Sequence, residues 1–307
     1  MSYPKVTIVG AGNVGATAAE LLLLNNVADV VMVDVVDGIP QGKALDMMHM
    51  RSIAKFGPVV SGTNDYADTA GSDIVVITAG VPRKPGMTRE DLLGTNSKIM
   101  SSVIDQVKAT SPEAIVICVT NPLDVMTYLA LKKSGLPKNR LFGMGGVLDS
   151  SRFAYAIQQA TGCDINDVEA IVVGAHGKGM VPLAKHSTVK GKPITEILSP
   201  EKVAEVCERT VNGGAEVVNF LKTGSAFYAP GASIATMVEA ILTDSHKTMS
   251  VCAYLEGEYG VNGICMCVPV KLGRSGIESI VDLGLDAEDS AALASSAKSI
   301  SESIAAL

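Results

Sequence analysis

The sequence predicts an α/β protein in which a doubly wound parallel sheet of the Rossmann type is followed by an α+β domain. In the first half, short β-branched runs with almost no polar residues alternate with helical stretches, an order typical of parallel sheets covered on both faces. After about residue 145 this alternation ends. We therefore expect two closely packed domains, residues 1–145 and 146–307, with no long linker between them.

The predicted elements follow the chain in this order. In the first domain the apolar runs predict strands at Val6–Val9, Val30–Val33, Ile74–Ile77 and Ile115–Val119. The periodic stretches between them predict helices at Val14–Leu24, Lys43–Met50 and Asp91–Ala109. In the second domain we expect helices at Ser150–Ala160, Pro200–Thr223, Gly231–Thr243 and Ala287–Ile304, and strands at Val168–Val173, Val251–Tyr254 and Gly263–Lys271.

Composition excludes several classes of partner. The 25 basic and 32 acidic residues give a net charge of −7, and no block of like charges offers a surface for nucleic acid. No apolar run reaches the roughly 18 residues of a membrane-spanning helix. The six cysteines suggest neither a disulfide framework nor a zinc site, so we expect no metal and a cytoplasmic location.

A glycine-rich turn follows the first predicted strand and opens the first predicted helix, with the sequence Gly10-Ala11-Gly12-Asn13-Val14-Gly15. In this context Gly10 permits a tight turn, Gly12 lets the backbone approach a pyrophosphate, and Gly15 lets helix and strand pack closely. Asp34 ends the second predicted strand, where a carboxylate binds ribose hydroxyls and repels a 2′-phosphate. The combination predicts a dinucleotide site that prefers NAD to NADP, rather than a purely structural turn.

Polar residues also follow the third and fourth predicted strands. Arg83 and Arg89 stand in a loop rich in proline and glycine, which suits a lid that carries two guanidinium groups to a carboxylate or carbonyl. Asn121 ends the fourth strand, where its amide can contact a cofactor and a substrate hydroxyl together. Taken alone, these residues would be assigned to a solvated loop and a turn.

Three residues of the second domain suggest acid–base chemistry. Asp149 and Arg152 lie on one face at the start of a predicted helix, where a simple ion pair is the alternative interpretation. His176 follows a hydrophobic strand and is flanked by glycines, which free the backbone to present an imidazole in a cleft. No Gly-x-Ser-x-Gly elbow accompanies them. A histidine with a carboxylate partner beside a nicotinamide instead suits proton transfer coupled to hydride transfer.

Seven motifs occur in order along the chain: GAGNVG, VDVVDGIPQGKALD, TAGVPRKPGMTREDLL, VTNPLD, GVLDSSRF, AHGKGMVPL and GSAFYAPG. With these motifs the chain resembles the lactate/malate dehydrogenase superfamily from Val6 through Val270, and most closely its lactate-dehydrogenase-like malate dehydrogenases. The resemblance implies reversible oxidation of malate to oxaloacetate with NAD. It also implies a homotetramer, with a homodimer as the alternative.

The resemblance implies a role for each matching residue. His176 becomes the proton acceptor, Asp149 its orienting partner, and Arg152 the clamp on the carboxylate beside the reacting carbon. Arg89 polarises the carbonyl when the loop closes, and Asn121 binds that oxygen. NAD is expected to contact Gly10, Ala11, Gly12, Asn13, Val14, Gly15, Asp34, Asn96, Val119, Thr120 and Asn121.

Two positions bear on substrate and activity. Lactate-specific relatives typically carry glutamine at the position of Arg83, so arginine here favours a substrate with a second carboxylate. Lys178 and Gly179 replace the acidic and hydroxyl residues usual after the active-site His-Gly, which puts the pKa of His176 in question. Lactate dehydrogenase and an NAD-binding homolog without turnover are therefore the alternative functions.

Overall fold

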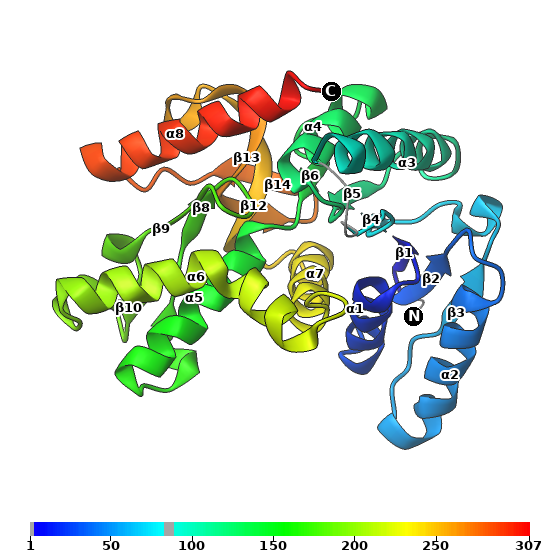
Figure 1. Ribbon diagram of the computed structural model, residues 1–307. Coiled ribbons are helices and arrows are strands. Elements are labelled where there is room, and N and C mark those ends of the chain that lie inside the picture. The colour runs from blue at the N-terminus through cyan, green and yellow to red at the C-terminus, as the bar shows by residue number, and fades with distance from the viewer. Residues whose placement is uncertain (1–2, 83–88) are drawn as a thin grey trace.

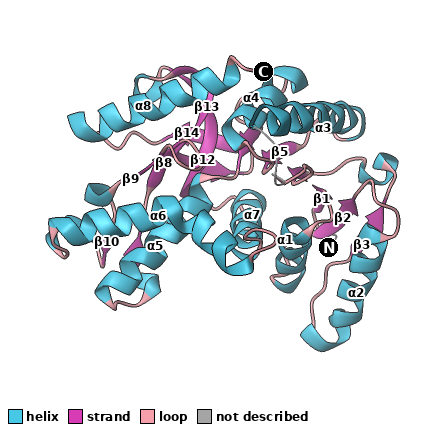
Figure 2. Ribbon diagram, viewed as in Figure 1, coloured by secondary structure: helices cyan, strands magenta, loops and turns pink. Residues whose placement is uncertain are grey.

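The computed structural model of the protein describes residues 3–82 and 89–307, and at Arg89 the backbone alone. Its larger sheet contains eleven strands and runs through both halves of the molecule (Figure 1). The strand order is β3-β2-β1-β4-β5-β6-β12-β13-β8-β9, with β14 paired to β13. Helices pack around this sheet (Figure 2).

The first half forms the parallel part of the sheet. Its strands are β1 (Lys5–Val9), β2 (Asp29–Val33), β3 (Val60–Thr63), β4 (Ile74–Ile77), β5 (Ile115–Cys118) and β6 (Leu141–Gly143). Its helices are α1 (Asn13–Leu24), α2 (Ile39–Ala54), α3 (Arg89–Thr110) and α4 (Leu123–Ser134), with a 3₁₀ turn at Tyr66–Thr69. The order 3-2-1-4-5-6 is that of a Rossmann sheet, and it confirms the predicted fold class.

The second half adds antiparallel strands. Its helices are α5 (Gly146–Thr161), α6 (Pro200–Leu221), α7 (Tyr228–Leu242) and α8 (Ala287–Ile304). Strands β8 (Val172–Gly174), β9 (Met180–Pro182), β12 (Lys247–Glu256), β13 (Asn262–Gly273) and β14 (Gly276–Ile280) extend the large sheet. A separate small sheet contains β7 (Val168–Glu169), β10 (Thr188–Val189) and β11 (Lys192–Pro193). Among the described residues, no helix is long and apolar enough to cross a membrane.

The buried strands divide the core into two layers. Along β4, Ile74 and Val76 face the layer beneath α1 and α7, whereas Val75 and Ile77 face the layer beneath α3 and α4. All four side chains are almost completely buried. This alternation explains why the strands of the first half read as continuous apolar runs, because both of their faces are covered.

Some elements differ from the prediction. The predicted strand Val168–Val173 is divided between β7 and β8, because the Ile171 N–H donates to the Ser187 hydroxyl at 3.0 Å and the chain passes there from one sheet to the other. Helix α5 begins at Gly146, earlier than predicted. Helix α4 and strands β3, β6, β9, β10, β11 and β14 were not predicted. Most residues of α4 are buried, so its sequence lacks the polar face that marks an amphipathic helix.

Helices α1 and α7 lie side by side and join the two halves (Figure 1). Gly231, in the first turn of α7, makes this approach possible. A Cβ atom at Gly231 would lie 2.6 Å from Thr17 Cγ2 and 3.1 Å from the backbone nitrogen of Ala18. The distance between the two helices therefore depends on a glycine.

Gly231→Ala should destabilise the protein by about 1–3 kcal/mol, because the added methyl group overfills this helix contact. Gly42→Ala, inside α2, is the matched control, since a Cβ atom there would meet nothing within 4 Å. The control should gain about 0.5–1 kcal/mol of stability. Urea unfolding followed by circular dichroism measures both, since the chain has no tryptophan. Equal unfolding midpoints for the two variants would contradict the role given to Gly231.

Candidate active site

The glycine-rich turn between β1 and α1 has the geometry that a dinucleotide requires. Gly10 has a φ of +103°, and a Cβ atom there would lie 2.8 Å from the Ala79 nitrogen. A Cβ atom at Gly15 would lie 2.1 Å from the Gly10 carbonyl oxygen. At Gly12, by contrast, a Cβ atom would meet nothing within 4 Å, so the space above the turn is open. Each glycine thus has the geometry that its predicted role demands.

The N-terminus of α1 is available to an anion. Its N-cap is Gly12, no side chain among the described residues caps the helix, and its first turn contains no acidic residue. The first N–H groups of a helix lack intrahelical partners and carry a positive partial charge, which favours a phosphate. The Lys43 ammonium, which donates to the Ala11 carbonyl oxygen at 2.7 Å, adds a positive charge beside the turn. These features fit a bound pyrophosphate.

Asp34 follows β2 and is fixed against the same turn. Its Oδ2 accepts the Ala11 N–H at 2.7 Å, and its Oδ1 accepts the Val36 N–H at 3.0 Å. Two backbone donors thus fix the orientation of the carboxylate, while its other lone pairs are free for ribose hydroxyls. This arrangement fits NAD, since a 2′-phosphate would meet a fixed negative charge.

Buried polar side chains tie together the ends of β4 and β5. The Asn96 Oδ1 accepts the Val81 N–H at 2.9 Å, and its Nδ2 donates to the Asn121 carbonyl oxygen at 2.7 Å. The Thr120 hydroxyl donates to the Ala79 carbonyl oxygen at 2.6 Å. Asn96 therefore supports two loops at the expected cofactor site.

Residues at the end of β5 differ in their exposure. Val119 is half-buried, whereas Asn121 is exposed and precedes Pro122 through a cis peptide bond. Within the described part of the chain the Asn121 amide makes no hydrogen bond. Its donors and acceptor are thus available to a ligand.

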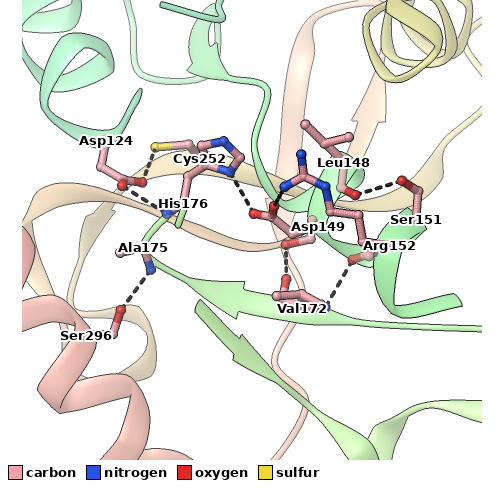
Figure 3. Close-up of polar contacts among 12 residues, drawn as sticks. Asp124, Leu148, Asp149, Ser151, Arg152, Val172, Ala175, His176, Cys252 and Ser296 are labelled. Carbon is pink, nitrogen blue, oxygen red and sulfur yellow. Dashed lines mark hydrogen bonds and ion pairs between the residues drawn. The ribbon is translucent and has the colours of Figure 1, made fainter. Parts of the chain in front are cut away.

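A buried carboxylate joins the three residues that suggested acid–base chemistry (Figure 3). Asp149 Oδ2 lies 2.8 Å from His176 Nδ1, and Asp149 Oδ1 lies 3.3 Å from Arg152 Nη1. The Asp149 side chain is 1% exposed. Asp149 and Arg152 project from α5, and His176 projects from the loop after β8. The ion pair considered as an alternative does exist, and the same carboxylate also holds the histidine.

The surrounding charges set the pKa of His176. Burial alone would lower this pKa, but the charge and hydrogen bond of Asp149 outweigh burial and raise it above its ordinary value. Asp124 acts in the same direction, and Arg152 opposes both carboxylates. The site therefore stabilises the imidazolium that forms when His176 accepts a proton.

The sequence analysis missed two contacts of the His176 loop. The backbone N–H of His176 donates to Asp124 Oδ2 at 3.0 Å, and the Ala175 N–H donates to the Ser296 hydroxyl at 2.8 Å (Figure 3). Asp124 is part of the VTNPLD motif, but in sequence it resembles an ordinary acid in the first turn of a helix. Ser296 carries no sequence signal.

The structure does not place the side chains of the two loop arginines. Arg83 lies outside the described residues, and Arg89 begins α3 without a described side chain. Their roles remain predictions from the sequence. The structure brings together His176, Asp149 and Arg152.

A Rossmann sheet with a dinucleotide turn and a buried histidine–carboxylate pair is typical of nicotinamide-dependent dehydrogenases. The sequence profile described as lactate/malate dehydrogenase, NAD binding domain matches residues 4–143. The profile for the alpha/beta C-terminal domain of the same family matches residues 146–307. The chain belongs to the lactate/malate dehydrogenase family, which confirms the resemblance of its motifs and the expected cofactor, NAD.

Individual relatives agree with this assignment. The chain is 53% identical over 304 residues to a malate dehydrogenase of Dehalococcoides mccartyi, a match that covers 99% of both proteins. It is 54% identical over 306 residues to a malate dehydrogenase of Bacteroides thetaiotaomicron, covering 99% of this chain and 97% of the relative.

Solved structures of both activities share the fold. Cryptosporidium parvum malate dehydrogenase superposes with a TM-score of 0.96 at 43% identity, covering 99% of this chain and 98% of the other. The lactate dehydrogenase of that organism, complexed with lactic acid and NAD, gives 0.96 at 41% identity with the same coverage. The fold alone therefore does not separate malate from lactate.

Asp34→Ser should narrow the preference for NADH over NADPH, mainly by raising kcat/KM for NADPH, because the fixed negative charge is lost. Asp29→Ser is the matched control. Asp29 begins β2, at the opposite end of the strand, and its carboxylate also accepts a backbone N–H, that of Val59, at 2.8 Å. Steady-state kinetics with both cofactors measure the ratio. An unchanged ratio in Asp34→Ser would show that another group discriminates.

Proposed function

We propose that the protein is an NAD-dependent malate dehydrogenase that interconverts (S)-malate and oxaloacetate. The observation that carries the proposal is the buried Asp149–His176 pair, which stands in the same sheet framework as the NAD-binding turn. The malate dehydrogenases that match almost the whole chain support malate as the substrate.

His176 serves as the acid–base group. Asp149 occupies Nδ1, so the other ring nitrogen, Nε2, is left to face the substrate hydroxyl. When bound, NAD supplies the acceptor for the hydride that leaves C2. In malate oxidation, neutral His176 takes the hydroxyl proton at Nε2, and Asp149 stabilises the resulting imidazolium. In the reverse direction the imidazolium returns this proton to the oxygen of oxaloacetate.

Arg152 binds the carboxylate beside the reacting carbon. One of its guanidinium nitrogens contacts Asp149, and its other donors, which have no hydrogen-bond partner among the described residues, can bind a carboxylate. Two glycines of α6 make room for this side chain. A Cβ atom at Gly213 would lie 3.2 Å from Arg152 Cδ, and one at Gly214 would lie 3.5 Å from its guanidinium nitrogens. The neighbouring helix is thus shaped around the arginine.

The two loop arginines and Asn121 complete the proposed substrate site. Arg83 pairs with the second carboxylate of oxaloacetate, and Arg89 polarises the carbonyl that is reduced. Asn121 donates to the same oxygen. The arginine roles rest on the sequence, because both side chains lie outside the described part of the chain.

Lactate dehydrogenase is the second candidate, because a lactate dehydrogenase is as similar in fold as the malate dehydrogenases. One assay separates the candidates: NADH oxidation with oxaloacetate, pyruvate and longer 2-keto acids. We expect the fastest turnover with oxaloacetate. Preference for pyruvate would favour the second candidate, and NADH binding without turnover would favour a homolog that has lost activity.

We further propose a homotetramer, with a homodimer as the alternative. Helix α2 exposes apolar side chains at Ile39, Leu45 and Ile53, and α6 exposes Phe220 at 77%. Apolar surface of this kind supports burial against other copies of the chain. Sedimentation equilibrium that shows a monomer would overturn the proposal.

A cytoplasmic location is part of the same proposal. The six cysteines are free thiols, and four of them are buried. Free thiols are typical of a reducing compartment. Cell fractionation with the native protein tests the location.

Asp149→Asn should lower kcat by about 10²–10⁴-fold, because the imidazolium loses its stabilising charge and orienting acceptor. The pKa of His176 should fall as well. Oxaloacetate reduction needs protonated His176, so its activity should decline at a lower pH than in the wild type. Asp164→Asn, which changes an exposed carboxylate that accepts the Asn166 N–H, is the control. Turnover of Asp149→Asn within threefold of wild type would overturn the pair.

Arg83→Gln should lower kcat/KM for oxaloacetate by at least about a hundredfold, near 2.7 kcal/mol, because the second carboxylate loses a charge-assisted partner. The kcat/KM for pyruvate should rise, because the variant has no guanidinium that would be enclosed without a partner beside the methyl group of pyruvate. Lys84→Gln, the same loss of charge in the same loop, serves as the control. An unchanged oxaloacetate-to-pyruvate ratio in Arg83→Gln would assign discrimination to another residue.

A further inference from the structure

The loop that carries His176 connects β8 to β9 and is held from outside by two side chains. The Ser296 hydroxyl accepts the Ala175 N–H at 2.8 Å and donates to the Gly179 carbonyl oxygen at 2.7 Å, so it bridges both legs of the loop. Asp124 Oδ2 accepts the His176 N–H at 3.0 Å. Ser296 belongs to α8 and Asp124 to α4, so the two anchors come from opposite halves of the chain (Figure 3).

We propose that Asp124 and Ser296 are positioning residues for His176, which fix the backbone of its loop and so place the imidazole against the substrate. This inference rests on the proposed acid–base role of His176. It adds two residues, each remote in sequence, to the set on which that role depends.

The loop needs anchors because its backbone is intrinsically free. Glycines occupy positions 174, 177 and 179, and Gly177 has a φ of +113°. Glycine-rich segments lose more conformational entropy on ordering than others do. Ser296 is 5% exposed and fits the loop closely, since a Cβ atom at Gly174 would lie 2.9 Å from its Oγ. A larger residue at position 174 would displace the hydroxyl that bridges the loop.

Asp124 contributes a charge as well as a hydrogen bond. It is 6% exposed, and its Oδ1 lies 3.5 Å from the Cys252 thiol. Burial raises its pKa to about 6, so the carboxyl is mainly ionised above that pH. Among the described residues it forms no ion pair with lysine or arginine. A buried carboxylate without such a partner is costly, and a function at this position explains why the cost is tolerated.

The groups that face the histidine act in known directions. Asp149 and Asp124 raise the pKa of His176, whereas burial and Arg152 lower it. Around Asp124, burial and the charge of Asp149 raise its pKa, whereas His176 and the hydrogen bond from Cys252 lower it. Removing the Asp124 charge should therefore lower the pKa of His176, whereas removing the Ser296 hydroxyl should leave it in place.

The chain provides a matched control for Ser296. The Ser187 hydroxyl is also buried, accepts the Ile171 N–H at 3.0 Å and donates to the Leu183 carbonyl oxygen at 2.9 Å. Ser187→Ala thus removes the same number and kind of hydrogen bonds from the same half of the protein. It does so without a bond to the His176 loop.

In oxaloacetate reduction, Ser296→Ala should lower kcat about tenfold or more, with KM for oxaloacetate and NADH affinity within about threefold, because a displaced imidazole impairs the chemical step. Ser187→Ala should lose similar stability in urea unfolding but keep kcat within about twofold of wild type. A Ser296→Ala kcat within about twofold of wild type, or an equal loss in both variants, would overturn the role of Ser296.

Asp124→Asn keeps one oxygen that can accept the His176 N–H. It removes the charge and places an amide nitrogen where an oxygen now accepts the Cys252 thiol. The pKa of His176, followed by NMR among the four histidines, should fall by about half a unit or more. The decline of oxaloacetate reduction with pH should move in the same direction. In Ser296→Ala, the pKa of His176 and the pH at which oxaloacetate reduction declines should both equal those of the wild type. An unchanged pKa in Asp124→Asn would overturn the role of its charge.

The activity of the wild type separates this inference from the proposed function. If the wild type fails to oxidise NADH with oxaloacetate or pyruvate, the proposed function fails, and the placement of His176 in catalysis fails with it. If the wild type is active and neither variant changes kcat or the pKa of His176, the inference alone fails.

Discussion

The site depends on the burial of one carboxylate. Asp149 is 1% exposed, and its two oxygens are divided between the imidazole of His176 and the guanidinium of Arg152. An ionised carboxylate in a protein interior carries a large free-energy cost, and partners of this kind offset it. The same pairing that offsets the cost of the buried carboxylate also fixes the imidazole of His176 and holds the guanidinium of Arg152 beside it. Stability and acid–base geometry therefore rest on one interaction.

The continuous sheet connects the Asp149–His176 pair with the glycine-rich turn. The parallel strands end at β6, which pairs with β12, and the antiparallel strands β13 and β8 follow in the same sheet. His176 stands just after β8, while the glycine-rich turn stands just after β1. The contact of α1 with α7 braces the two halves a second time. The nucleotide turn and the histidine are thus parts of one framework.

Sequence patterns predicted the features of the site that depend on residues close together in the chain. The glycine-rich turn could be predicted because its constraints, a tight turn and a close helix, act within a few residues, and Asp149 and Arg152 share a helix face. The two anchors of the His176 loop could not be predicted in this way. Asp124 and Ser296 lie 52 and 121 residues from their partners, and such pairings leave no periodic signal. Helix α4, which carries Asp124, escaped prediction for a related reason, because it is buried on most sides.

Lys178 carries a charge two residues from His176, which had put the pKa of this histidine in question. Lys178 is exposed, and within the described residues its ammonium has no hydrogen-bond or ionic partner. A charge in water is strongly screened, whereas charges in the interior act through a lower effective dielectric. The pKa of His176 accordingly follows burial, Asp149, Asp124 and Arg152, and it is raised despite the nearby lysine. The charge of Lys178 therefore changes the solvent side of the loop, whereas the buried contacts of His176 with Asp149 and Asp124 remain intact.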